Sequence, residues 1–76
     1  MSPTAEKVRA ILAAQMDVDE DKITAATNIA EELGADSLDL VELMMSVEEE
    51  FDISIEEEQV KTFKTVGDVA DYIDAQ

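Results

Sequence analysis

Apolar side chains in this chain recur at the spacing of an α-helix, and no segment alternates cleanly between apolar and polar residues as a half-buried strand would. The chain has 76 residues and no cysteine, so a single small core has to hold the fold without disulfide bonds. The pattern therefore predicts an all-α fold in one domain, residues 1–76, built as a small four-helix bundle.

Three main helices and one short helix are predicted from the apolar stripes and the capping residues. The predicted helices span about residues 3–16, 37–51, 55–63 and 66–75. The predicted N-caps are Ser2, Asp36, Ser54 and Thr65. Ser54 with Glu57 has the spacing of a capping box. A long loop over residues 17–36 joins the first two helices, and we expect Ile23, Ile29 and Leu33 to anchor it to the core.

Acidic residues dominate the charge, with 20 Asp and Glu against 5 Lys and Arg, no histidine, and a net charge of −15. This balance excludes a nucleic-acid-binding protein and a protein that adsorbs to anionic lipid. Without His or Cys the chain lacks the commonest general base, the commonest zinc ligands and a thiol nucleophile. We therefore expect no enzymatic activity, no specific metal site and no membrane insertion, but a cytoplasmic monomer with basic partners.

The predicted helix over residues 37–51 has two apolar faces. At about 100° per residue, one stripe of ordinary width faces the core; it comprises Leu40, Leu43, Met44, Val47 and Phe51. Leu38, Val41 and Met45 lie on the opposite side, bordered by Glu42 and Glu49. A buried face would not be bordered by unpaired carboxylates, and residues 23–60 contain twelve acids and no base. The second stripe is therefore predicted to be an exposed partner-binding strip rather than scattered surface residues.

Ser37 begins this helix, where a hydroxyl beside free backbone N–H groups could hold a phosphate. Spacing alone favours an ordinary first-turn serine, because serines are common at helix starts. A serine hydrolase is disfavoured because no histidine or other base is near in the sequence and the Gly-x-Ser-x-Gly turn is absent. An EF-hand starting at Asp17 is disfavoured because Lys22 replaces its turn glycine and Asn28 its bidentate glutamate.

The segment Gly34-Ala35-Asp36-Ser37-Leu38-Asp39 resembles the attachment signature of acyl carrier proteins, and the similarity extends over essentially the whole chain. The resemblance implies a four-helix bundle whose serine, here Ser37, is esterified with 4′-phosphopantetheine by a carrier protein synthase. Asp36 and Leu38 match the residues that flank the serine in that family. One departure is that the short third helix is entered as Ile55-Glu56-Glu57, where many relatives have a proline before the acids.

The resemblance further implies that growing acyl chains are carried as thioesters on this arm in fatty-acid biosynthesis. The implied partners are the synthase (a phosphopantetheinyl transferase), malonyl transacylase, ketoacyl synthases, reductases, dehydratase and acyltransferases, all with basic docking patches. The implied docking residues are Leu38, Asp39, Val41, Glu42, Met45, Glu48 and Glu49. Two alternatives remain at this stage: a carrier of a polyketide or specialised lipid pathway, and an acidic interaction domain without a prosthetic group.

Overall fold

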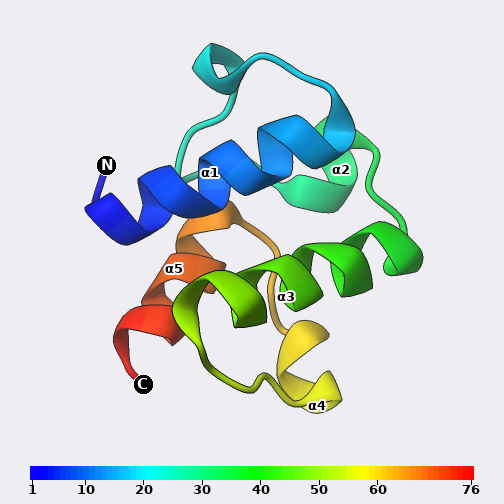
Figure 1. Ribbon diagram of the computed structural model, residues 1–76. Coiled ribbons are helices and arrows are strands. Elements are labelled where there is room, and N and C mark those ends of the chain that lie inside the picture. The colour runs from blue at the N-terminus through cyan, green and yellow to red at the C-terminus, as the bar shows by residue number, and fades with distance from the viewer.

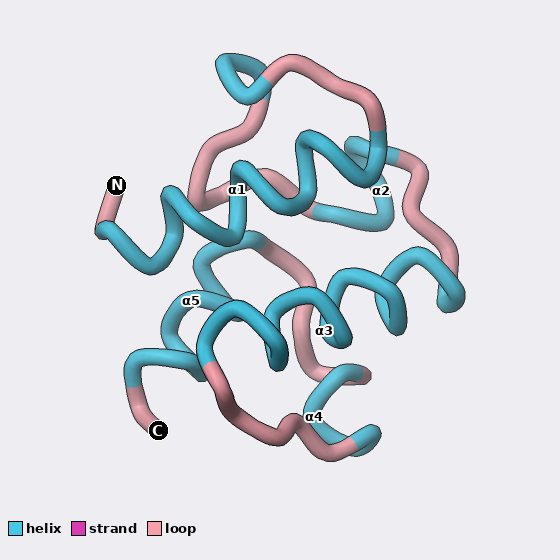
Figure 2. Tube along the Cα trace, viewed as in Figure 1, coloured by secondary structure: helices cyan, strands magenta, loops and turns pink.

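The computed structural model describes residues 1–76 and consists of helices joined by loops, with no strand and one isolated β-bridge between Asn28 and Thr65 (Figures 1 and 2). The elements in chain order are α1 (Pro3–Met16), a 3-10 turn (Glu20–Lys22), α2 (Ile29–Leu33), α3 (Ser37–Phe51), α4 (Glu57–Val60) and α5 (Val66–Asp74). The predicted all-α bundle with three main helices, a short helix and a long connection is confirmed. The connection additionally contains α2, which the apolar pattern alone did not predict.

Helix α1 lies across the bundle and packs against both α5 and α3 (Figure 1). All three long helices contribute side chains to one core, whose fully buried large residues include Val8, Leu12, Leu43, Val47, Val66 and Val69. On α1, Val8 and Leu12 are buried, while Ile11 and Met16 are only partly buried against that core. On α5 the buried residues are Val66, Val69, Ala70 and Ile73.

The long connection is fixed to the rest of the fold by buried apolar anchors and by backbone hydrogen bonds. Ile23 and Ile29 are almost fully buried, as predicted, whereas Leu33 is partly buried. The N–H of Ile29 donates to the carbonyl of Lys64 (2.9 Å), and the N–H of Gly67 donates to the carbonyl of Ala25 (2.8 Å). These bonds hold the connection against the start of α5. Segments far apart in the sequence thus satisfy each other's buried backbone groups.

Local capping sequences set most of the helix ends. The Ser2 side chain accepts from the N–H of Ala5 with Pro3 in the first turn, and Thr65 forms a full capping box with Asp68. The prediction that Ser54 caps the short helix was wrong. Helix α4 begins at Glu57 after Glu56, without a side-chain cap.

Packing against α3 explains the later start of α4. Ile53 and Ile55 pack against the core, and the N–H of Ile55 donates to Oε2 of Glu48 at 2.8 Å. These contacts occupy the residues on either side of Ser54, and α4 begins only beyond them. The helix ends at Val60 rather than at the predicted Phe63, which is buried in the core.

We predict that the neighbouring methionines of α3 differ sharply in their contribution to stability. Met44 is 3% exposed and Met45 is 60% exposed. Met44→Ala should lower the free energy of unfolding by about 2–5 kcal/mol through lost burial and a cavity. Met45→Ala should change it by no more than about 0.5 kcal/mol. Urea unfolding of both variants measures this, and similar losses for the two would show that the outer stripe is buried.

We predict that Asp68 makes the stability of α5 pH-dependent. Its Oδ2 accepts from the N–H groups of Lys64 (2.9 Å) and Thr65 (3.0 Å), and these bonds hold the pKa of the carboxyl below its usual value. A lowered pKa stabilises the fold above the ordinary carboxyl pKa, and this contribution is lost as the pH falls through the folded value. Asp68→Asn should therefore cost a few tenths of a kcal/mol at pH 7, and this difference should shrink below about pH 4.

Unfolding of wild type and variant across this pH range tests the linkage. The matched control is Asp71→Asn, an exposed carboxylate on the same helix. A difference between wild type and Asp68→Asn that stays constant from pH 7 to pH 3 would contradict this role.

Candidate functional site

A reciprocal capping box fixes the start of α3. The N–H of Asp39 donates to Oδ1 of Asp36 (3.0 Å), and the N–H of Asp36 donates to Oδ2 of Asp39 (3.1 Å). Each carboxylate thereby satisfies a backbone donor that the helix itself cannot. The box makes Ser37 the first residue of α3, in a helix of 15 residues. Asp36 and Asp39 therefore both cap the start of α3, whereas the sequence analysis predicted a cap only at Asp36.

Ser37 is exposed, and its hydroxyl makes no hydrogen bond to another residue. The N–H groups of Ser37 and Leu38 have no acceptor in the fold either, as expected for the first turn of a helix. A helix start with free N–H groups favours negative charge. An accessible oxygen, free amides and a favourable helix end are the features that a serine phosphate ester requires, so the residues fit such a group.

Ser37 lies at the edge of a groove between α3 and α4. The groove has a volume of about 380 Å³ and is lined by Ser37, Leu40, Val41, Glu57, Val60, Lys61 and Phe63. Four of these seven side chains are apolar, so the groove offers a largely apolar wall next to an exposed hydroxyl. Of these residues, the sequence analysis had placed only Ser37 and Val41 in a functional site. Val60, Lys61 and Phe63 share this groove with Ser37 because of how α4 packs against α3. Helical spacing in the sequence does not specify that packing.

The predicted outer stripe of α3 is exposed. Leu38 is 65%, Val41 46% and Met45 60% accessible, whereas Leu43, Met44 and Val47 on the opposite face are buried. These three exposed residues, here called the apolar strip, begin immediately after Ser37. Apart from Met1, they are the only large hydrophobic side chains exposed in the protein. Because they lie together on one helix face, this face is the strongest candidate for a binding surface in the protein.

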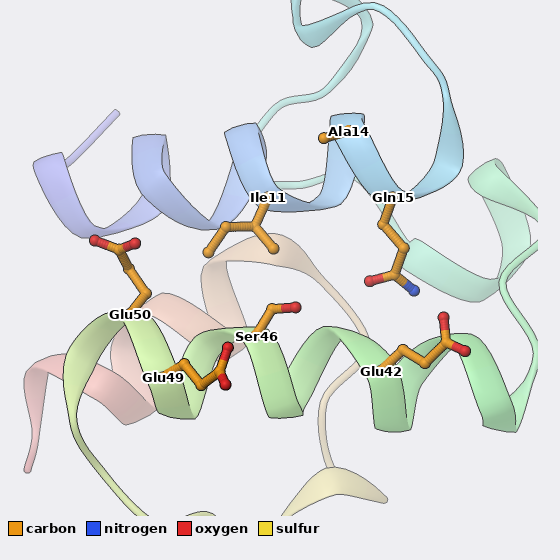
Figure 3. A pocket seen from close by; sticks show the side chains of 7 residues that line it. All are labelled: Ile11, Ala14, Gln15, Glu42, Ser46, Glu49 and Glu50. Carbon is orange, nitrogen blue, oxygen red and sulfur yellow. The ribbon is translucent and has the colours of Figure 1, made fainter.

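The acids predicted to flank the strip occupy different positions in the structure. Glu42 and Glu49 are exposed and line a second groove, between α1 and α3, with a volume of about 620 Å³ (Figure 3). Glu50 also lines it and forms an ion pair with Lys7, with a distance of 3.4 Å between Nζ and Oε2. Glu48 is instead partly buried and accepts from the N–H of Ile55. The strip thus has acidic groups along its α1 side, while Glu48 serves the packing of the α3–α4 connection.

One polar side chain of α1 also reaches this second groove. Gln15 lines it, and its Nε2 donates to the backbone carbonyl of Asp39 at 2.7 Å. Figure 3 shows Gln15 and Ile11 pointing from α1 toward the side of α3 that carries Glu42, Ser46 and Glu49. The sequence analysis gave Gln15 no role. Its contact links α1 to the first turn of α3 and so supports the position of Ser37.

No group of three or more His, Cys, Asp or Glu side chains is placed to hold a metal ion. The aspartates that suggested a calcium loop have structural roles: Asp17 ends α1 in a left-handed backbone conformation, and Asp19 caps the 3-10 turn by accepting from the N–H of Asp21. None of the helices has the length and apolar character needed to cross a bilayer.

Comparison with known proteins identifies the family. Residues 6–73 match the family described as phosphopantetheine attachment site. The acyl carrier protein of Enterococcus faecalis is 33% identical in sequence, with 95% of this chain and 91% of that chain covered and a TM-score of 0.80. A protein from Anaplasma phagocytophilum assigned as an acyl carrier protein is 28% identical, with 97% and 88% covered and a TM-score of 0.86. The chain therefore belongs to the acyl carrier proteins of the phosphopantetheine attachment family, which carry 4′-phosphopantetheine and are not themselves enzymes.

Proposed function

We propose that Ser37 is the residue that carries 4′-phosphopantetheine, and that the protein shuttles growing acyl chains between enzymes of fatty-acid biosynthesis. The observation that carries this proposal is the position of Ser37. Its hydroxyl is exposed, without a hydrogen-bond partner, at the first residue of α3. It lies inside the Asp36-Ser37-Leu38 triplet, with the apolar strip on one side and the α3–α4 groove on another.

Attachment is a phosphoryl transfer in which this chain supplies only the nucleophile. Oγ of Ser37 forms the new ester bond to phosphorus, the phosphoanhydride bond of coenzyme A breaks, and adenosine 3′,5′-bisphosphate leaves. The serine proton must pass to a base. The chain has no histidine, and the carboxylates of Asp36 and Asp39 are bonded to backbone N–H groups. The carrier protein synthase therefore supplies the base, which makes docking of that enzyme a requirement for attachment.

The attached arm supplies the thiol that holds an acyl group as a thioester. This accounts for a carrier without a single cysteine of its own. The protein's part is to present the arm. The capping box holds Ser37 at the tip of α3, the α3–α4 groove gives the start of the arm an apolar wall, and the small domain acts as a monomer among cytoplasmic enzymes.

Docking of partner enzymes is proposed to use the apolar strip together with the acids on its α1 side. Long-range attraction between acidic and basic surfaces speeds encounter, while a small apolar contact keeps each complex short-lived. The strip, Glu42 and Glu49 are exposed on the helix that begins at Ser37, so an enzyme bound along α3 would meet them and the arm together. The proposed partners are the synthase, malonyl transacylase, ketoacyl synthases, reductases, dehydratase and acyltransferases. Asp39 and Glu48 would act there mainly by keeping the helix start and the α3–α4 connection in place.

We predict that modification depends on Ser37 alone. Intact-mass spectrometry after incubation with coenzyme A and a carrier protein synthase should show one phosphopantetheine increment on the wild type and none on Ser37→Ala. The matched control is Ser54→Ala, which removes another exposed serine and should be modified like the wild type. An increment that survives Ser37→Ala, or its absence from the wild type, would refute the attachment site. Acyl groups recovered from the protein in its native host would then identify the pathway.

We predict that Glu42→Lys slows attachment by the synthase about tenfold in kcat/KM at low ionic strength, because a steering charge is reversed next to the strip. The difference from wild type should narrow as salt screens the charges. Asp71→Lys changes the net charge by the same amount on α5 and serves as the control. Equal slowing by both variants would show that only net charge matters and would contradict docking at α3.

A further inference from the structure

Lys61 is the only basic residue that lines the groove beside Ser37. The remaining lining residues are Ser37 itself, Glu57 and four apolar side chains. Residues 23–60 contain no base, so Lys61 is the first cation in the sequence after Ser37. It follows directly on α4, at its C-cap. The packing of α4 against α3 therefore brings a cation to the groove that opens at the proposed attachment point.

The ammonium group of Lys61 is not engaged by the acids of this protein. Lys7 pairs with Glu50 and Arg9 with Glu20, at 3.4 and 3.7 Å. Lys61 forms no ion pair within 4 Å and its side chain donates no hydrogen bond, although the chain has 20 acidic residues and Glu57 lines the same groove. Lys22 and Lys64 are unpaired as well, but neither lines this groove, so Lys61 is the one cation there that is available to another anion.

A phosphate ester on Ser37 would place an anion at this edge of the groove. Glu57 in the groove and the capping carboxylates of Asp36 and Asp39 would repel it, while the free N–H groups of Ser37 and Leu38 at the start of α3 would attract it. We propose that Lys61 is a positioning residue for the arm, whose ammonium group pairs with the phosphate esterified to Ser37 and holds the start of the arm at the α3–α4 groove. This inference rests on the proposed attachment at Ser37.

The exposure of Lys61 fits a carrier that has to release its arm. A solvent-exposed ion pair is weak, since water screens it and two flexible groups lose freedom. Such a pair biases the position of the arm between encounters without opposing its transfer into an enzyme. A basic residue buried at this position would hold the arm more tightly and would carry a larger desolvation cost.

Lysine reactivity measures the pair without relying on transfer activity. Apo protein and protein loaded with the arm are treated briefly with an acetylating N-hydroxysuccinimide ester, and acetylation is quantified at each lysine by mass spectrometry. Loading should slow acetylation of Lys61 about two- to fivefold, the range expected for an exposed ion pair. Lys64 and Lys22 are exposed, lie outside the groove and should react equally in both forms. Ser37→Ala treated with the synthase should show no slowing at Lys61.

Phosphorus NMR of the loaded protein provides a second readout. Lys61→Gln should shift the phosphodiester resonance and abolish its dependence on salt concentration, whereas the matched variant Lys64→Gln should leave both as in the wild type. Equal behaviour of the two variants, or unchanged Lys61 acetylation in a protein whose intact mass confirms the arm, would overturn the role of Lys61 and leave attachment at Ser37 intact. A missing mass increment would instead overturn the attachment itself, and this inference with it.

Discussion

The fold depends on the burial of one face of α3, while the opposite face stays exposed. Leu43, Met44 and Val47 are enclosed by the core that α1 and α5 complete, and this contact positions the helix that carries Ser37. A helix buried all round could not present the apolar strip or the acids beside it. The bundle is small enough to leave the other face in water, so the same helix is a core element and carries the proposed docking surface.

Acidic charge is distributed in a way that favours association over stability. Only two ion pairs offset 20 carboxylates, and both involve α1. The repulsion that remains opposes the compact state, yet it surrounds the first turn of α3 with a field that attracts basic partners. Lys22, Lys61 and Lys64 form no ion pair, and Lys61 is distinguished from the other two by lining the α3–α4 groove together with Ser37.

Helix limits were predictable where capping is local. Ser2, Asp36 and Thr65 each accept from a backbone N–H three residues later, and the long helices begin where these residues predict. Ser54 has the same spacing to Glu57 but caps nothing, because contacts of Ile53 and Ile55 with the core determine that segment. The short helix α2 was also missed. Its cap is nevertheless local, because Oδ1 of Asn28 accepts from the N–H of Glu31 and Gly34 ends the helix in a left-handed conformation. Five residues are too few to show an apolar stripe, so the apolar pattern overlooked this signal.

The sequence by itself determined the helical class, the apolar and acidic faces of α3 and the position of Ser37 at its start, because periodicity and capping act over a few residues. It also predicted which apolar face would be exposed, because Glu42 and Glu49 lie beside Leu38, Val41 and Met45. Only the tertiary structure decided which residues share a groove with Ser37. Lys61, Val60 and Phe63 reach it through the path of residues 52–56 and the packing of α4 on α3. Those contacts depend on how buried surfaces fit together across the chain, which no local pattern specifies.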